Sequence, residues 1–189
     1  MAKKKSGGKT ADTAKVVFGG IVAVLLIGAI VAASVGIASI FWKTPLNEGN
    51  NAIVRNDPGE WYYNGSDAAV YKEDPYMQGG KLIVTAESWG DDYFYFRYQP
   101  GEKEGLNLGD EFSVTFKAKL SADGEIAYRY DNDSTPVTTA ELIADEEQEL
   151  TLEGCVYTDG SGPFYVGVPS DTEPGATLTV WDVEFTVEE

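Results

Sequence analysis

Residues 111–120 read Glu-Phe-Ser-Val-Thr-Phe-Lys-Ala-Lys-Leu. Apolar and polar side chains alternate along it without a break. Such a period of two is typical of a β-strand with one face in a core and the other in water. We therefore expect a strand over Glu111–Leu120 whose buried face carries Phe112, Val114, Phe116, Ala118 and Leu120.

The same alternation recurs on both sides of this strand. Longer candidates lie at residues 81–88, 92–99, 124–131, 148–157, 163–168 and 176–187, and shorter ones at 52–55, 60–64, 69–72 and 137–143. Turn signals such as Gly79-Gly80, Asp159-Gly160 and Pro174-Gly175 separate them. In the last candidate we expect Thr179, Trp181, Val183, Phe185 and Val187 to form the core face. Many short strands predict an all-β jelly-roll sandwich.

Composition narrows the possible functions. The chain has 189 residues and a net charge of −17, and almost all acidic residues follow residue 42, so nucleic acid is not an expected partner. Histidine is absent, which removes the commonest general base and every Ser-His or Cys-His pair. The single cysteine, Cys155, lies in an alternating stretch and is expected to be buried.

The N-terminal part carries the longest apolar run. Residues 16–42 contain no charge and exceed the roughly 20 residues that cross a bilayer, and Trp42 and Lys43 close the run. The preceding lysines favour a cytoplasmic N-terminus. We expect a single-pass protein of the cell membrane with a disordered basic tail (1–15), a transmembrane helix (16–42), a stalk (43–51) and an extracellular domain (52–189).

A cleaved signal peptide is the competing interpretation of this run. Val31-Ala32-Ala33 before Ser34 offers the small residues of a cleavage site. The run continues to Trp42, however, which a signal peptide does not need, so the sequence favours a retained signal-anchor. Small residues spaced four apart on one helix face also permit close packing with another helix: Gly28, Ala32 and Gly36.

Several short features together resemble a known family. They are Gly79-Gly80-Lys81-Leu82-Ile83-Val84, residues 92–99, the stretch Leu106-Asn107-Leu108-Gly109-Asp110 leading into the strand that ends Lys-Ala-Lys, and the closing Trp181-Asp182-Val183. This order resembles the carbohydrate-binding modules of families four and nine, which share the galactose-binding-like jelly roll. The resemblance spans residues 52–187 and implies binding of a polysaccharide or cell-surface sugar.

The resemblance also implies a structural calcium ion. In the family an acidic residue of the last strand helps to hold the ion, and Asp182 matches that position, with Glu60 as a possible partner. Carboxylate oxygens are hard ligands of the kind that calcium prefers. We expect no other cofactor.

Sugar recognition needs flat aromatic faces together with polar groups. In residues 92–99 the Phe side chains are expected in the core, which leaves the row Tyr93, Tyr95 and Arg97 exposed. Arg129 could add polar contacts on the same sheet, and Trp89, in the turn Ser88-Trp89-Gly90, could form a platform at a loop tip.

The sequence thus predicts a membrane-anchored extracellular carbohydrate-binding module without catalytic activity. No Gly-x-Ser-x-Gly, phosphate-binding loop or Cys/His metal spacing is present. The alternative is a structural or adhesive surface protein whose jelly roll mediates protein–protein contacts or self-association. An exposed aromatic row beside polar groups favours the first function, whereas fully buried aromatics and a flat outer face favour the second.

Overall fold

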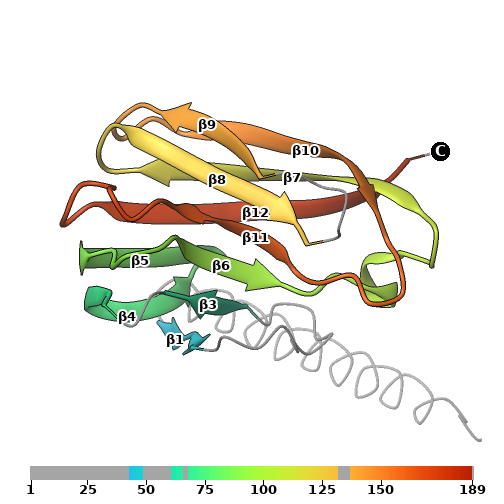
Figure 1. Ribbon diagram of the computed structural model, residues 1–189, viewed down its shortest axis with the longest axis horizontal. Coiled ribbons are helices and arrows are strands. Elements are labelled where there is room, and N and C mark those ends of the chain that lie inside the picture. Colours follow the sequence, from blue (N-terminus) through green and yellow to red (C-terminus); the bar gives the residue numbers. More distant parts are fainter. Residues whose placement is uncertain (1–42, 49–60, 66–67, 132–136, 189) are drawn as a thin grey trace, which may run out of the picture. The chain divides into compact units, whose positions relative to one another are not determined.

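The computed structural model describes residues 43–48, 61–65, 68–131 and 137–188 (Figure 1). The predicted tail and membrane helix and the candidate strand at 52–55 lie outside these residues. Within the described ranges no helix is long and apolar enough to cross a membrane.

Two six-stranded sheets form a sandwich (Figure 1). In strand order, sheet A contains β1 (Thr44–Pro45), β4 (Val70–Gln78), β5 (Lys81–Ser88), β12 (Thr177–Val187), β7 (Glu111–Leu120) and β10 (Gln148–Val156). Sheet B contains β2 (Asn47–Glu48), β3 (Tyr62–Asn64), β6 (Phe94–Tyr98), β11 (Phe164–Val168), β8 (Gly124–Tyr130) and β9 (Thr138–Leu142). A 3₁₀ turn occupies Glu102–Glu104. The predicted all-β sandwich is confirmed.

The core lies between the sheets and follows the alternation of β7. All five apolar side chains of this strand are fully buried. Phe116 contacts Tyr128 of β8 and Phe164 of β11, with ring centroids 5.2 and 5.6 Å away, so one ring joins both sheets. Cys155 is also buried, as predicted, and burial raises the pKa of its thiol to about 12.

The predicted turn at Gly79-Gly80 joins β4 and β5. Gln78 pairs with Lys81 across it, and both glycines have positive φ angles, 58° and 75°. A two-residue hairpin with two positive φ angles matches the right-handed twist of the strands it connects. Glycine adopts these angles without strain, which is why this pair of residues ends one strand and starts the next.

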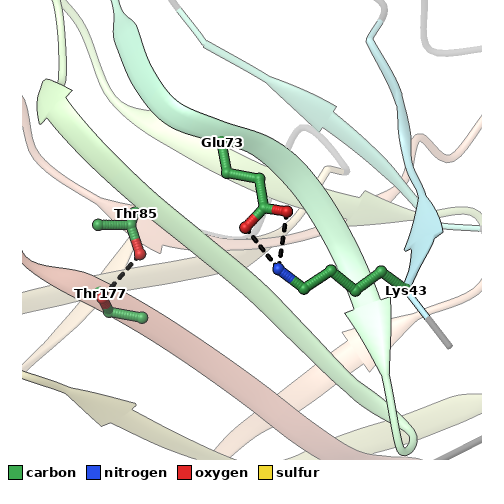
Figure 2. Close-up of polar contacts among 4 residues, drawn as sticks. All are labelled: Lys43, Glu73, Thr85 and Thr177. Carbon is green, nitrogen blue, oxygen red and sulfur yellow. Dashed lines mark hydrogen bonds and ion pairs between the residues drawn. The ribbon is translucent and has the colours of Figure 1, made fainter. Parts of the chain in front are cut away.

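The predicted stalk at residues 43–51 is wrong for its described part. Thr44 and Pro45 pair with β4 of sheet A, and Asn47 and Glu48 pair with β3 of sheet B. Lys43 fixes the start of the segment, because its Nζ lies 2.6 Å from Glu73 of β4 (Figure 2). This short segment forms strands because it lies beside two open sheet edges, a long-range effect that its polar composition does not reveal.

The predicted core face of the last strand is also wrong in part. Leu178 and Val180, rather than Thr179, are fully buried. Asp182 has a φ of 51°, and the register with β7 shifts by one residue between Trp181 and Glu184. Such a bulge reverses which side chains face inward. Even-numbered residues therefore point into the core before the bulge, and Phe185 packs against the core after it. The prediction assumed that the alternation is unbroken. It therefore assigned Thr179 to the same core face as Phe185.

Candidate functional site

The outer face of sheet B carries an unusual set of side chains. In β6, Phe94 and Phe96 are fully buried in the core, so Tyr95 and Arg97 lie on the opposite face. In β11 the same alternation places Tyr165 on that outer face. We call the outer side chains of sheet B the aromatic face, which comprises Tyr62, Tyr93, Tyr95, Arg97, Arg129 and Tyr165.

The strand register assembles this face into rows. Tyr165 of β11 lies opposite Arg97 of β6 on one side and Arg129 of β8 on the other. Tyr62 of β3 extends the row beyond Arg97. Four neighbouring strands therefore contribute the sequence Tyr-Arg-Tyr-Arg across the sheet.

The aromatic side chains of this face contact one another. The rings of Tyr93 and Tyr95 are stacked, with centroids 5.4 Å apart and planes 17° apart. Tyr95 meets the edge of Tyr165 at 5.6 Å, and the Arg129 guanidinium lies over the Tyr165 ring at 5.0 Å. Stacked rings and a cation over a ring hold each other in fixed orientations. The result is one continuous platform and not a set of isolated tyrosines.

Two neighbouring strands meet very closely beneath the platform. Gly167 of β11 pairs with Tyr95 of β6. A Cβ atom at position 167 would lie only 1.7 Å from the Phe94 carbonyl oxygen, so no other residue fits without moving the backbone. Glycine at this position therefore keeps β6 and β11 at the spacing that brings Tyr95 to Tyr165.

Exposure varies along the platform. Tyr93 is 38% exposed and Tyr95 is half-buried, whereas only 2% of Arg97 is exposed. The expectation that Arg97 is exposed is therefore wrong, although its side of the sheet was predicted correctly. Large tyrosine neighbours surround it on both adjacent strands, and the spacing of residues within one strand cannot reveal such cover.

Burial shifts the pKa values of two side chains on the aromatic face, Tyr95 and Arg97. It raises the pKa of Tyr95 to about 12, against an opposing effect of Arg129. Burial lowers the pKa of Arg97, and the hydroxyl groups of Tyr165 and Tyr62 partly offset this change. No carboxylate is among these causes. Arg97 therefore carries its charge in a water-poor site, and none of the described carboxylates is its neighbour.

Several buried polar atoms on the outer side of sheet B have no hydrogen-bond partner among the described residues. They are Nε and Nη2 of Arg97, Nε of Arg129 and Oδ1 of Asn64, which lies opposite Tyr95 in the register. Buried polar groups are nearly always satisfied in folded proteins, and an unsatisfied one is costly. Three donors and one acceptor on the same face are groups that a bound molecule could satisfy.

Acidic side chains lie beyond the Tyr93 end of the platform. Glu125 and Glu141 pair across β8 and β9, and they line a shallow hollow with Tyr93, Asp123 and Asp171. The arginines belong to the row at the other end. The face therefore has a direction, with positive charge at one end and negative charge at the other.

The prediction for Trp89 as a loop-tip platform is wrong. Only 1% of Trp89 is exposed, and its ring meets Phe94 edge to face at 5.7 Å. Its Nε1 donates a hydrogen bond to the Glu173 carbonyl oxygen at 3.2 Å. The turn that holds Trp89 folds back over the end of the sandwich, so a large apolar ring in a predicted loop serves the core.

The calcium prediction stays a prediction. Asp182 occupies the β12 bulge and forms an ion pair with Lys117 Nζ at 2.9 Å. Glu60 lies outside the described residues. Among the residues that the structure describes, no three acidic, cysteine or histidine side chains cluster as a metal site would require.

A second hollow, of about 310 Å³, lies between apolar rings, among them Trp61, Trp181 and Phe185. Its Glu104 carboxylate accepts hydrogen bonds from the Tyr98 hydroxyl and from Gly101 N. The polar group there is thus satisfied from within the domain, in contrast to the arginines of the aromatic face.

Sequence reasoning missed Tyr62 and Tyr165 as members of the site. The alternation of Phe164, Val166 and Val168 does place Tyr165 on the opposite face of its strand. What the sequence lacks is the strand order, because β6 and β11 are neighbours although β7, β8, β9 and β10 separate them along the chain.

No protein-family model and no curated protein matches the sequence. Among solved structures, a CBM4 structure (a family 4 carbohydrate-binding module) aligns with a TM-score of 0.56 and 18% identity, over 80% of this chain and 97% of its own. The N-terminal cellulose-binding domain of β-1,4-glucanase C from Cellulomonas fimi aligns with a TM-score of 0.48 and 18% identity, over 77% of this chain and 98% of its own.

A third structure, TmCBM61 in complex with β-1,4-galactotriose, aligns with a TM-score of 0.45 and 14% identity, over 70% of this chain and 92% of its own. Of these three alignments, the one with the CBM4 structure carries the likeness in fold. The resemblance predicted from short sequence features is thereby confirmed at the level of the fold. The β-domain of this chain has the jelly-roll fold of a carbohydrate-binding module.

Proposed function

We propose that this protein binds a glycan, without catalysis, on the aromatic face of sheet B. The observation that carries the proposal is the stacked pair Tyr93 and Tyr95 in contact with Tyr165. The apolar C–H face of a sugar ring packs on such aromatic planes, and Arg and Asn side chains supply donors and an acceptor for its hydroxyl groups. The fold shared with a CBM4 structure supports this function.

The partial exposure of Tyr93 and Tyr95 favours glycan binding over a purely structural or adhesive role. A structural role would require no open aromatic row beside unsatisfied polar groups. Among the described residues, the buried atoms of Arg97, Arg129 and Asn64 that lack partners support a face that takes up a ligand.

A glycan array with the full chain in detergent tests the proposal. The variant Tyr93→Ala/Tyr95→Ala should lose binding by about a hundredfold or more, because two stacking planes are lost and one such plane is worth about 1–3 kcal/mol to a nucleic-acid base. The matched control Tyr76→Ala/Leu108→Ala removes a similar apolar area away from the aromatic face and should bind normally. Absence of binding to every glycan, or equal losses in both variants, would contradict the proposal.

The array should be repeated with calcium and with a chelator. Loss of binding only with the chelator, together with a lower melting temperature, would support a structural ion held by Asp182 and Glu60. Unchanged binding and melting would remove the calcium prediction and leave the aromatic face unaffected.

The proposed location is the outer surface of the cell membrane, with residues 16–42 as a retained signal-anchor and residues 1–15 in the cytoplasm. The support is the uncharged length of residues 16–42 behind a lysine-rich tail. Intact mass measurement of the protein from cells should give the full chain in the membrane fraction. A mature chain that begins at Ser34 would show that the segment is a cleaved signal peptide.

A further inference from the structure

The positive charges of the aromatic face are exceptional in so acidic a protein. The chain contains 31 Asp and Glu residues against 14 Lys and Arg, yet two of its arginines flank Tyr165 in one row. Neighbouring strands lie about 4.8 Å apart, so the backbones of Arg97 and Arg129, two strands apart, are separated by about 10 Å.

Neither arginine forms an ion pair with a described carboxylate. The lysines Lys43, Lys117 and Lys119 each have an acidic partner within 3.1 Å, but Arg97 and Arg129 have none. Their buried Nε atoms, and Nη2 of Arg97, meet no hydrogen-bond acceptor within the part of the chain that the structure describes. A buried cation without a partner is costly, and an anion that reaches it gains both attraction and hydrogen bonds.

One further acidic group faces this row. Asp131 follows Arg129 by two residues and acts on the Tyr165 hydroxyl, whose pKa is raised chiefly by burial. It lies too far from either guanidinium for an ion pair, and its carboxylate approaches Gly162 instead. Asp131 therefore reduces the positive potential of the row without satisfying its donors.

We infer that the glycan bound on the aromatic face is an anionic one, whose uronic-acid carboxylate lies at the Arg97–Tyr165–Arg129 row. This inference rests on the proposed function and names the class of sugar. A hydroxyl group could accept one hydrogen bond there, but only an anion also compensates the two charges. A planar carboxylate matches the fork of donors on a guanidinium.

The two arginines have different parts in this site. Arg129 is partly exposed over Tyr165, so it can contact the carboxylate directly. Arg97 is buried between the tyrosines of the neighbouring strands, so it attracts the carboxylate electrostatically without direct contact. The carboxylate has only one favourable position, because Glu125 and Glu141 repel it at the opposite end of the face.

The other surface carboxylates of the domain should determine how binding depends on the salt concentration. Repulsion between a polyuronate and the surface carboxylates acts over long range and is screened by salt, with a Debye length of about 8 Å at physiological ionic strength. The contact with Arg129 is short-range and is screened less. Raising the salt concentration should therefore weaken binding little, unlike the steep loss seen when an anion binds an exposed basic patch.

The experiment compares two forms of one sugar on the full chain in detergent. The probes are an oligogalacturonate and the same oligosaccharide after chemical reduction of its carboxyl groups to alcohols. Titration calorimetry should show binding of the acidic form at least about tenfold tighter, as expected for hydrogen bonds to a charged group. Arg129→Gln should reduce this preference to about twofold or less, and Arg129→Lys should restore part of it.

Lys119→Gln is the matched control, since it removes one positive charge on sheet A and should keep the preference. Equal or tighter binding of the reduced form would overturn the inference and leave glycan binding intact. A preference that survives Arg129→Gln in a folded variant would also overturn it. Failure of both forms, and of every other glycan on the array, would overturn the proposed function as well.

Discussion

The outer faces of the two sheets hold their cations in different ways. On sheet A each lysine with an ion pair lies at the surface beside a carboxylate, as in Lys117–Asp182 at 2.9 Å and Lys119–Asp145 at 3.1 Å. Hydroxyl groups there also pair, and Thr85 Oγ1 lies 2.7 Å from Thr177 Oγ1 (Figure 2). Lys81 differs, since it lies over the Trp181 ring at 4.0 Å, but the paired lysines and threonines of sheet A satisfy one another.

Sheet B has an apolar inner face like that of sheet A, but the cations of its outer face have different neighbours. Its arginines lie among tyrosines, lack carboxylate partners within the described residues and leave buried donors unsatisfied. Buried polar groups that lack a partner within the protein call for a partner from outside it, such as water or a bound molecule. This difference between the two outer faces supports the proposed site more strongly than the number of tyrosines does.

Loss of an aromatic ring from the core between the two sheets should strongly reduce the stability of the domain. Phe116→Ala should lower the free energy of unfolding by about 3–5 kcal/mol, because Phe116 contacts both Tyr128 and Phe164 of the facing sheet. Thr115→Ala, on the wet side of the same strand, should change it by less than about 0.5 kcal/mol. Urea unfolding measures both. Similar values for the two variants would contradict the assignment of the core.

Gly167→Ala should disturb sheet B in particular. The added Cβ would lie 1.7 Å from the Phe94 carbonyl oxygen, so β6 and β11 must separate, and we expect a loss of about 1–3 kcal/mol of stability. Gly124→Ala is the control, because its Cβ would meet only a Leu120 methyl group at 3.0 Å. Equal melting temperatures for the two variants would show that the close approach of the strands is not required.

Arg97→Leu should stabilise the unliganded protein, by about 1 kcal/mol, while weakening glycan binding. It removes a buried charge that has no acidic partner and fills the space with an apolar side chain. Lys119→Leu on sheet A should give no comparable gain, since that lysine is solvated and paired. A large loss of stability in Arg97→Leu would mean that the arginine serves the fold and would weaken the contrast between the faces.

A smaller effect should appear at alkaline pH. Burial raises the pKa of Tyr95 to about 12 from an ordinary value of 10.0, so its neutral form is favoured in the folded state. The resulting stability is fully present below pH 10 and is lost as the pH rises from 10 toward 12. Stability measured across this range should decline less in Tyr95→Phe. An identical decline would show that water reaches the Tyr95 hydroxyl freely.

The sequence predicts local features well and long-range ones poorly. The alternation of β7 and the turn at Gly79-Gly80 depend on neighbouring residues only, and both are found where expected. The bulge at Asp182 and the burial of Trp89 depend on partners far along the chain, and both were missed. Alternation placed Tyr93 and Tyr95 on one face, but strand order alone brings Tyr165 to them.

We propose that a glycan lies on the outer face of sheet B. The most direct test is a structure of the protein with a bound oligosaccharide chosen from the array. The account predicts a sugar ring within about 4.5 Å of the Tyr93 and Tyr95 rings, with polar contacts toward Arg129. A sugar bound instead in the hollow beside Trp61, Trp181 and Phe185, with the aromatic face empty, would contradict it.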